Sequence, residues 1–520
     1  MRVLLVEPNY RRTKPKAGSL EESKWYPPLG LMKIARFHID RGDEVQFAHG
    51  CDETKLPVLD LFNCDELWDR VYITTLFTFH FKKIVETINF YKYKAVGGTA
   101  SKIFVGGIMS TLMADDIFEM TGIYPVLGVI NSSKSQLGLL GKNGKDVNVD
   151  NLVPYLELFD SDLYAIADTY YGYTSRGCVN KCAWCGVPIL EPEFIPYIDL
   201  KQTIGSLRKQ YGDKRYLKLM DNNILASKHL DQVIDDLLEL GYGKNDTDDK
   251  GLSRIIDFNQ GLDASYFNEE NILKIKQLNI KPMRIAFDRL KEKDEYTKAI
   301  RLAESHGFDE FSNYMLYNYR DSPKDLYERL IINIKLNEEF MAKSGSNIKS
   351  GKIYSYPMRY APINNTGKNE NRSRDIIFPI PKEVDWLNSP VWTKRFIRNI
   401  EIMKGVAHGA ISPTPGLAWR TIGHTFEEFV TNLYMPEEFL RNRNKHEKKV
   451  YPFNTSQIPG TGLLEEFRAF LLDLLSDQDS DKFRYFHQAV TQNSLPVVTK
   501  AINSTNDKEL KQWLNYYLTK

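Results

Sequence analysis

The sequence predicts an α/β protein with three parts: an N-terminal doubly wound parallel sheet, a partial (β/α)6 TIM-like barrel and a C-terminal helical region. Short apolar runs alternate with amphipathic segments over about 360 residues, with one interruption between 131 and 168. After about residue 362, the remaining periodic segments have helical spacing only. We therefore expect parts at 1–135, 169–362 and 363–520, with 136–168 as a linker that is rich in Gly, Asn, Ser and Asp.

The N-terminal part begins with an apolar run at 2–6, which is typical of a buried parallel strand. The prolines Pro27 and Pro28 precede a helix predicted over 31–41, and Gly42 ends it. Further strands are expected at 44–47, 70–76 and 102–105, with helices at 81–91 and 114–120. This alternation predicts a doubly wound sheet.

The alternation restarts after residue 168 with six βα units, and this repetition favours a parallel barrel, complete or incomplete, over a second open sheet. The expected strands are 171–174, 216–220, 254–259, 283–288, 311–317 and 353–359. The expected helices are 199–211, 229–240, 269–277, 295–305 and 323–337, followed in the C-terminal region by 425–434, 436–444, 462–475 and 508–518.

Charge and apolar content narrow the function classes. The chain has 69 Lys+Arg against 68 Asp+Glu, which argues against a protein that mainly coats nucleic acid or an anionic membrane. The basic run at 441–449 is interpreted as a solvated helix end, which is the commoner case for such runs. The alternative is that its side chains contact RNA phosphates. The N-terminal apolar run is too short for a signal peptide, and no stretch approaches the ~18 apolar residues of a membrane span. We expect a cytoplasmic protein with no membrane partner.

Three of the five cysteines are clustered as Cys178, Cys182 and Cys185, in the pattern CxxxCxxC. At this cysteine content the pattern arises by chance with a probability of roughly 0.0005, so the spacing is informative. Three thiolates can ligate three irons of a [4Fe–4S] cluster and leave one iron open. The alternative is a zinc site, which requires a fourth ligand, and His229 is the nearest histidine. That alternative would make the protein a non-catalytic, zinc-stabilised binding protein.

The cysteine motif, with Trp184 just before its last cysteine, resembles that of the radical S-adenosylmethionine superfamily. The resemblance implies an enzyme in which S-adenosylmethionine chelates the open iron through its amino and carboxylate groups. It also implies a one-electron donor such as flavodoxin or ferredoxin, and cleavage of S-adenosylmethionine to a 5′-deoxyadenosyl radical that acts on a substrate the sequence does not identify. Cys51 and Cys64 lie outside the motif, and we expect them to be inert thiols of the core of the N-terminal part.

Polar residues that follow the later strands are the other candidates for binding the cofactor, because parallel barrels place their chemistry at strand ends. Asp221 lies in a turn that resembles the Asp-rich turn of the superfamily, which implies contact with the methionine amino group. The resemblance similarly implies that Asn259, Gln260 and Asp263 contact the ribose. The alternative for these acidic residues, above all Asp263, is helix capping.

The N-terminal part is similar to the cobalamin-binding domain of some radical enzymes, in its opening Val6-Glu7-Pro8 and in Val105-Gly106-Gly107-Ile108. The DxHxxG motif that supplies a histidine to cobalt is absent from the sequence. Two interpretations stay open: a cobalamin-dependent radical methyltransferase, or a domain that only packs beside the barrel and shapes the substrate mouth. A methylthiotransferase is not expected, since the N-terminal part has Cys51 and Cys64 but no third cysteine for a second cluster.

Overall fold

The computed structural model describes residues 1–520 except 11–13, 17–19, 58–66, 344–350, 361, 363–382, 406–408, 443–461 and 520. The chain divides into two compact units, and we describe each by itself. The first is formed mainly by residues 1–260 together with Gln277–Ile280, and the second mainly by the rest of the chain after Gly261. Cys64 and most of the basic run at 441–449 lie outside the described residues.

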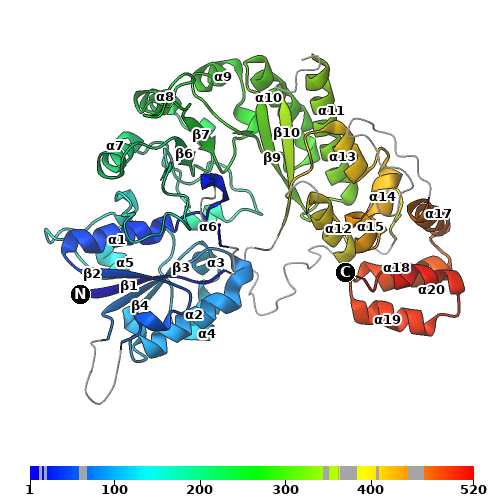
Figure 1. The fold of residues 1–520 in the computed structure, drawn as a ribbon, viewed down its shortest axis with the longest axis horizontal. Helices are drawn as coiled ribbons and strands as arrows, with labels where there is room; N and C mark the ends of the chain where they lie inside the picture. Colours follow the sequence, from blue (N-terminus) through cyan, green and yellow to red (C-terminus); the bar gives the residue numbers. More distant parts are fainter. Residues whose placement is uncertain are drawn as a thin grey trace. The chain divides into compact units, whose positions relative to one another are not determined.

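The first unit begins with a four-stranded parallel sheet in the order β2-β1-β3-β4 (Figure 1). Its strands are β1 (Arg2–Glu7), β2 (Glu44–His49), β3 (Arg70–Thr75) and β4 (Ile103–Gly107), and its main helices are α1 (Leu29–Arg41), α2 (Phe81–Lys94), α3 (Ile108–Leu112) and α4 (Ala114–Thr121). Along β1, Leu4 and Val6 enter one apolar cluster while Val3 and Leu5 enter another. Because successive side chains point to opposite faces, the sheet is buried on both, as the sequence predicts.

The segment 136–168 differs from the predicted linker. It includes the end of the short helix α5 (Ser133–Leu137) and contains the 3-10 turn η5 (Val149–Asn151). Its side chains Val149, Phe159 and Tyr164 are buried in the same cluster as residues of β1 and α1. These apolar residues are irregularly spaced, so neither helical nor strand periodicity reveals them. The segment is therefore part of the core of the N-terminal sheet.

A second parallel sheet in the first unit has the order β5-β6-β7. Its strands are β5 (Thr169–Gly172), β6 (Tyr216–Leu219) and β7 (Ile255–Phe258). They are separated along the chain by α6 (Val187–Leu190), α7 (Leu200–Tyr211) and α8 (Leu230–Glu239). The carboxyl ends of these strands carry the cysteine loop and the polar residues singled out from the sequence.

The second unit contains a parallel sheet in the order β10-β9-β8. Its strands are β8 (Met283–Arg284), β9 (Glu310–Tyr317) and β10 (Lys352–Arg359), and its first helices are α9 (Glu269–Ile275), α10 (Lys293–Ser305) and α11 (Pro323–Lys343). A strand is present at each of the six expected places, although β5 covers Thr169–Gly172 where the sequence predicts 171–174, and β8 has two residues where the sequence predicts a strand over 283–288. The six strands form two three-stranded sheets, and their closure into one partial barrel stays a prediction.

The other described residues of the second unit are mainly helical. The helices are α12 (Lys394–Gly405), α13 (Pro415–Ile422), α14 (Phe426–Tyr434), α15 (Glu437–Arg441), α17 (Leu463–Ser476), α18 (Asp481–Thr491), α19 (Leu495–Ser504) and α20 (Lys508–Asn515). The sequence analysis did not assign α12, α13, α18 or α19. Over the described part of the chain, no helix combines the length and apolarity that a membrane crossing requires.

Candidate functional site: a cysteine loop held by buried carboxylates

The three clustered cysteines lie in the irregular segment between β5 and α6. Cys178, Cys182 and Cys185 are partly buried thiols. The loop turns tightly, since the Cys185 N–H donates to the Cys182 carbonyl at 3.0 Å. Two sulfurs accept backbone hydrogen bonds: Cys178 Sγ from Asn180 N–H at 3.3 Å and Cys185 Sγ from Val187 N–H at 3.4 Å.

The three cysteine thiols are ligands of the chemical type that the predicted iron-sulfur cluster requires. Three thiols lie within eight residues of one loop, and backbone N–H groups contact two of the sulfurs, as is common around thiolate-ligated clusters. Among the described residues, no three His, Cys, Asp or Glu side chains are grouped as metal ligands.

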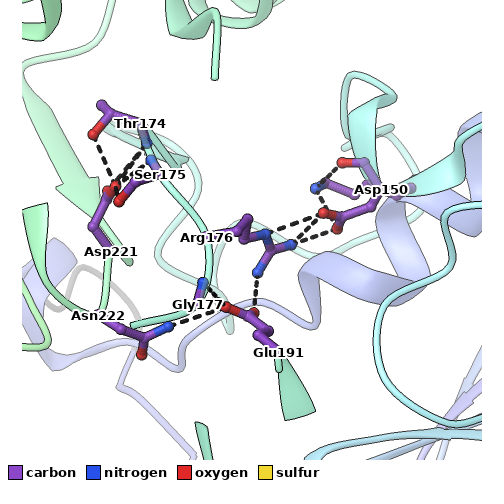
Figure 2. A network of polar contacts seen from close by, with 9 residues as sticks. Asp150, Thr174, Ser175, Arg176, Gly177, Glu191, Asp221 and Asn222 are labelled. Carbon is purple, nitrogen blue, oxygen red and sulfur yellow. Dashed lines mark hydrogen bonds and ion pairs between the residues drawn. The ribbon is translucent and has the colours of Figure 1, made fainter. Parts of the chain in front are cut away.

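Asp221 connects the end of β6 to the start of the cysteine loop. It is 2% exposed, and its Oδ1 accepts hydrogen bonds from the Thr174 N–H at 3.0 Å and hydroxyl at 2.8 Å, and from the Ser175 N–H at 2.5 Å and hydroxyl at 2.7 Å (Figure 2). Burial raises the pKa of Asp221, against the opposing effect of these four donors. In this structure the carboxylate holds residues that precede Cys178, and its contact with the methionine amino group stays a prediction.

Arg176 extends from the same loop into a buried chain of charges. Its Nε lies 3.1 Å from Asp150 Oδ2, and its Nη2 lies 2.5 Å from both Asp150 oxygens (Figure 2). On its other side Asp150 accepts from Lys33 Nζ at 3.0 Å. Burial disfavours the ionised carboxylate, but Lys33 and Arg176 outweigh it and hold the pKa of Asp150 below its ordinary value. Burial lowers the pKa of Lys33 despite the attraction of Asp150.

Glu191 closes the other end of the loop, directly after α6. Its carboxylate accepts from Arg176 Nη1 at 2.7 Å, from the Gly177 N–H at 2.7 Å and from Asn222 Nδ2 at 3.1 Å. Gly177 has φ +70, and a Cβ there would lie 2.1 Å from the Glu193 carbonyl oxygen. Only glycine fits this position, because both its backbone conformation and the available space exclude a side chain.

The other residues predicted to bind S-adenosylmethionine are Asn259, Gln260, Asp263 and Trp184, and their surroundings in the structure differ. Asn259 Oδ1 accepts from Tyr26 Oη at 2.9 Å, and Gln260 lines a cavity of the first unit. Asp263, in the second unit, accepts from the Ser265 N–H at 3.0 Å and hydroxyl at 2.7 Å and caps a 3-10 turn, whereas Asn268 caps the helix α9 that the capping alternative assigned to Asp263. Trp184 is partly buried in the cysteine loop.

The cavity has a volume of about 360 Å³ and lies at the carboxyl ends of β3 and β4. The side of the cavity towards the cysteine loop includes Arg176, Glu191, Asn222 and Gln260, and Lys33 and Asp150 also line it. Sequence reasoning missed Lys33, Asp150 and Glu191 as parts of this site, because no motif marks them and because Asp150 lies in the segment interpreted as a linker.

Fold and site together define an α/β protein of parallel sheets in which a three-cysteine loop follows the first strand of a βα series. The solved structures that are similar to it include two of known description. One is the apo form of OxsB, a cobalamin-dependent S-adenosylmethionine radical enzyme, with a TM-score of 0.45 and 12% identity, over 99% of this chain and 84% of that chain. The other is HydG, a maturase of the [FeFe]-hydrogenase, with a TM-score of 0.30 and 12% identity, over 68% of this chain and 81% of that chain. No protein-family model and no curated protein matches the sequence.

Proposed function

We propose that the protein is a radical S-adenosylmethionine enzyme whose [4Fe–4S] cluster is bound by Cys178, Cys182 and Cys185. The observation that carries the proposal is the CxxxCxxC loop after β5, whose first residues are held by the buried Asp221, through Thr174 and Ser175, and by the partly buried Glu191, through Arg176 and Gly177. When bound, the cluster supplies the single electron that cleaves S-adenosylmethionine. The substrate is not identified, and the electron comes from a donor such as flavodoxin or ferredoxin.

In this proposal the chain's own residues bind and orient. The cysteines ligate three irons, while the N–H groups that contact Cys178 and Cys185 stabilise negative charge on their sulfurs. Asp221, Asn259 and Gln260 of the first unit are proposed to bind S-adenosylmethionine together with Trp184 of the loop. For Asp221 this would be a second role beside holding Thr174 and Ser175.

Anaerobic purification followed by metal analysis tests the proposal. We expect a brown protein with about four irons per chain, broad absorption near ~400 nm that dithionite bleaches, and formation of 5′-deoxyadenosine from S-adenosylmethionine. A colourless protein that holds one equivalent of zinc would overturn the proposal in favour of the zinc-stabilised binding protein.

Cobalamin-dependent methyl transfer is the second candidate function, and the cavity at the sheet's strand ends favours it. Ligands of open α/β sheets bind beyond the carboxyl ends of the strands, where Gly106 and Gly107 line this cavity. Gly107 has φ +111, and a Cβ there would lie 2.3 Å from the Thr75 carbonyl oxygen. Incubation with hydroxocobalamin and desalting tests this candidate: retention of one equivalent supports it, and complete loss excludes stable binding.

A further inference from the structure

The cavity of the first unit is mainly apolar. Fifteen of its 28 lining residues, counted over the described chain, have aliphatic, methionine or phenylalanine side chains. Ile73 and Val105 come from the sheet, Val129 and Ile130 from the segment after α4, and Val187 and Leu190 from α6. Such a lining favours ligands that bring apolar surface out of water.

The charges of the lining cancel. Among the described residues around the cavity the charged ones are Lys33, Asp150, Arg176 and Glu191, two cations and two anions. They alternate along one chain of contacts: Lys33 to Asp150 at 3.0 Å, Asp150 to Arg176 at 2.5 Å, and Arg176 to Glu191 at 2.7 Å. A charged ligand group would find no uncompensated countercharge here, and its desolvation would be unfavourable.

Uncharged polar groups are also present. Thr74, Asn222 and Gln260 line the cavity, so a hydroxyl or amide group of a ligand can be hydrogen-bonded there. The volume of about 360 Å³ lies at the lower end of the ~300–1,000 Å³ range of sites for drug-sized molecules.

From these observations we propose that the cavity is a binding site for an uncharged, mainly apolar small molecule that carries at most hydroxyl or amide groups. Because the cavity lies beside the cysteine loop, we assign its ligand as the substrate of the enzyme. Only this assignment rests on the proposed function. Binding itself requires neither the cluster nor S-adenosylmethionine, so it can be tested separately from the enzymatic proposal.

Two dyes that share one ring system provide the test. N-phenyl-1-naphthylamine is uncharged, and 1-anilino-8-naphthalenesulfonate adds a sulfonate to the same scaffold. Equilibrium dialysis of the full-length protein should give a dissociation constant at least tenfold lower for the neutral dye. Equal affinities, or tighter binding of the sulfonate, would overturn the proposal.

Two pairs of variants locate the binding and its selectivity. Val129→Trp fills the cavity and should weaken binding of the neutral dye at least tenfold, whereas Leu127→Trp, which is exposed and does not line this cavity, should not change it. Glu191→Gln removes one anion from the lining and should strengthen binding of the sulfonate at least fivefold. Glu193→Gln, an exposed neighbour outside the lining, is its control and should have no effect.

The variants and a competition experiment with hydroxocobalamin can also overturn the proposal. Unchanged binding of the neutral dye to Val129→Trp would place the dye elsewhere and overturn the site. Circular dichroism verifies that each variant is folded. If Glu191→Gln does not fold, the proposal is still tested by the two dissociation constants of the wild type and by binding of the neutral dye to Val129→Trp. If hydroxocobalamin is retained and displaces the neutral dye, the occupant is cobalamin and the proposed ligand class is wrong.

Discussion

The guanidinium of Arg176 and the carboxylate of Asp150 form a two-sided ion pair, with Nε 3.1 Å from Oδ2 and Nη2 2.5 Å from Oδ1. Both side chains are largely buried, and Tyr173 adds a ring 3.5 Å from the guanidinium carbon. The pair joins the irregular segment after α5 to the residues directly before Cys178. Folding of that segment and geometry of the cysteine loop are therefore physically linked.

Asp150→Ala should destabilise the first unit by about 3–5 kcal/mol, because it leaves Lys33 and Arg176 as buried cations that have lost their shared partner. Urea unfolding measures the loss. The double variant Asp150→Ala with Arg176→Met should be less destabilised than the sum of the two single variants. Additive effects would show that the pair does not contribute through direct interaction.

Cys178→Ala, Cys182→Ala and Cys185→Ala should each abolish both iron binding and 5′-deoxyadenosine formation, since two thiolates do not hold the cuboidal cluster. Cys51→Ala is the matched control, because this thiol contacts Thr87 and lies outside the loop; it is exposed, so its predicted place in the core was wrong. Iron content and absorption near ~400 nm are the measurements. Loss of iron in Cys51→Ala would contradict the ligand assignment.

Gly177→Ala should displace the cysteine loop and lower iron content, because the added methyl group collides with the Glu193 carbonyl oxygen and φ is positive. Gly205→Ala is its control: within α7 a Cβ at Gly205 meets nothing within 4 Å. That helical substitution should stabilise by ~0.5–1 kcal/mol and leave iron unchanged. Equal iron content in the two variants would show that the loop tolerates a side chain at position 177.

Asp221→Ala leaves the N–H and hydroxyl groups of Thr174 and Ser175 without their common acceptor. Each buried donor that loses its partner costs ~1–3 kcal/mol, so both melting temperature and iron content should fall. Isothermal titration with S-adenosylmethionine separates the two proposed roles. A variant with normal iron but weaker S-adenosylmethionine binding would favour the methionine contact over the loop-holding role.

Asp321 in the second unit should make stability depend on pH in mild acid. Burial raises the pKa of Asp321 to about 6, against the opposing effect of Arg329, from an ordinary value of 3.8. The raised value means that Asp321 favours folding fully below about pH 4 and that this contribution is lost as pH rises to about 6. The stability of the wild type relative to Asp321→Asn should therefore fall by about 3 kcal/mol across this interval.

Chemical unfolding at several pH values measures that difference. Asp309→Asn is the control, because this carboxylate is about half exposed and its pair with Lys281 spans 3.5 Å at the surface. The gap between wild type and Asp309→Asn should stay constant. A wild-type stability that does not decline relative to Asp321→Asn between pH 4 and 6 would contradict the raised pKa.

Many of the strands and helices, and the cysteine motif, are properties of the sequence by itself. The run Val3 to Val6 and the helix that starts at Leu29 are encoded by neighbouring residues, through apolar periodicity and flanking prolines. Cys178, Cys182 and Cys185 are equally local, since their spacing within eight residues is the whole signal. Such features can be predicted because the interactions that produce them act over a few residues along the chain.

Only the tertiary structure brought Asp150, Glu191 and Asp221 to the residues that surround the cysteine loop. Asp221 lies 47 residues from Thr174 and Asp150 lies 26 residues from Arg176, and no periodicity connects positions so far apart. The same holds for Tyr164, which packs against β1 from a segment without regular structure. Which buried carboxylate meets which donor depends on the path of the chain between them, because an ion pair or a buried hydrogen bond forms only where folding has already placed both partners within about 3 Å.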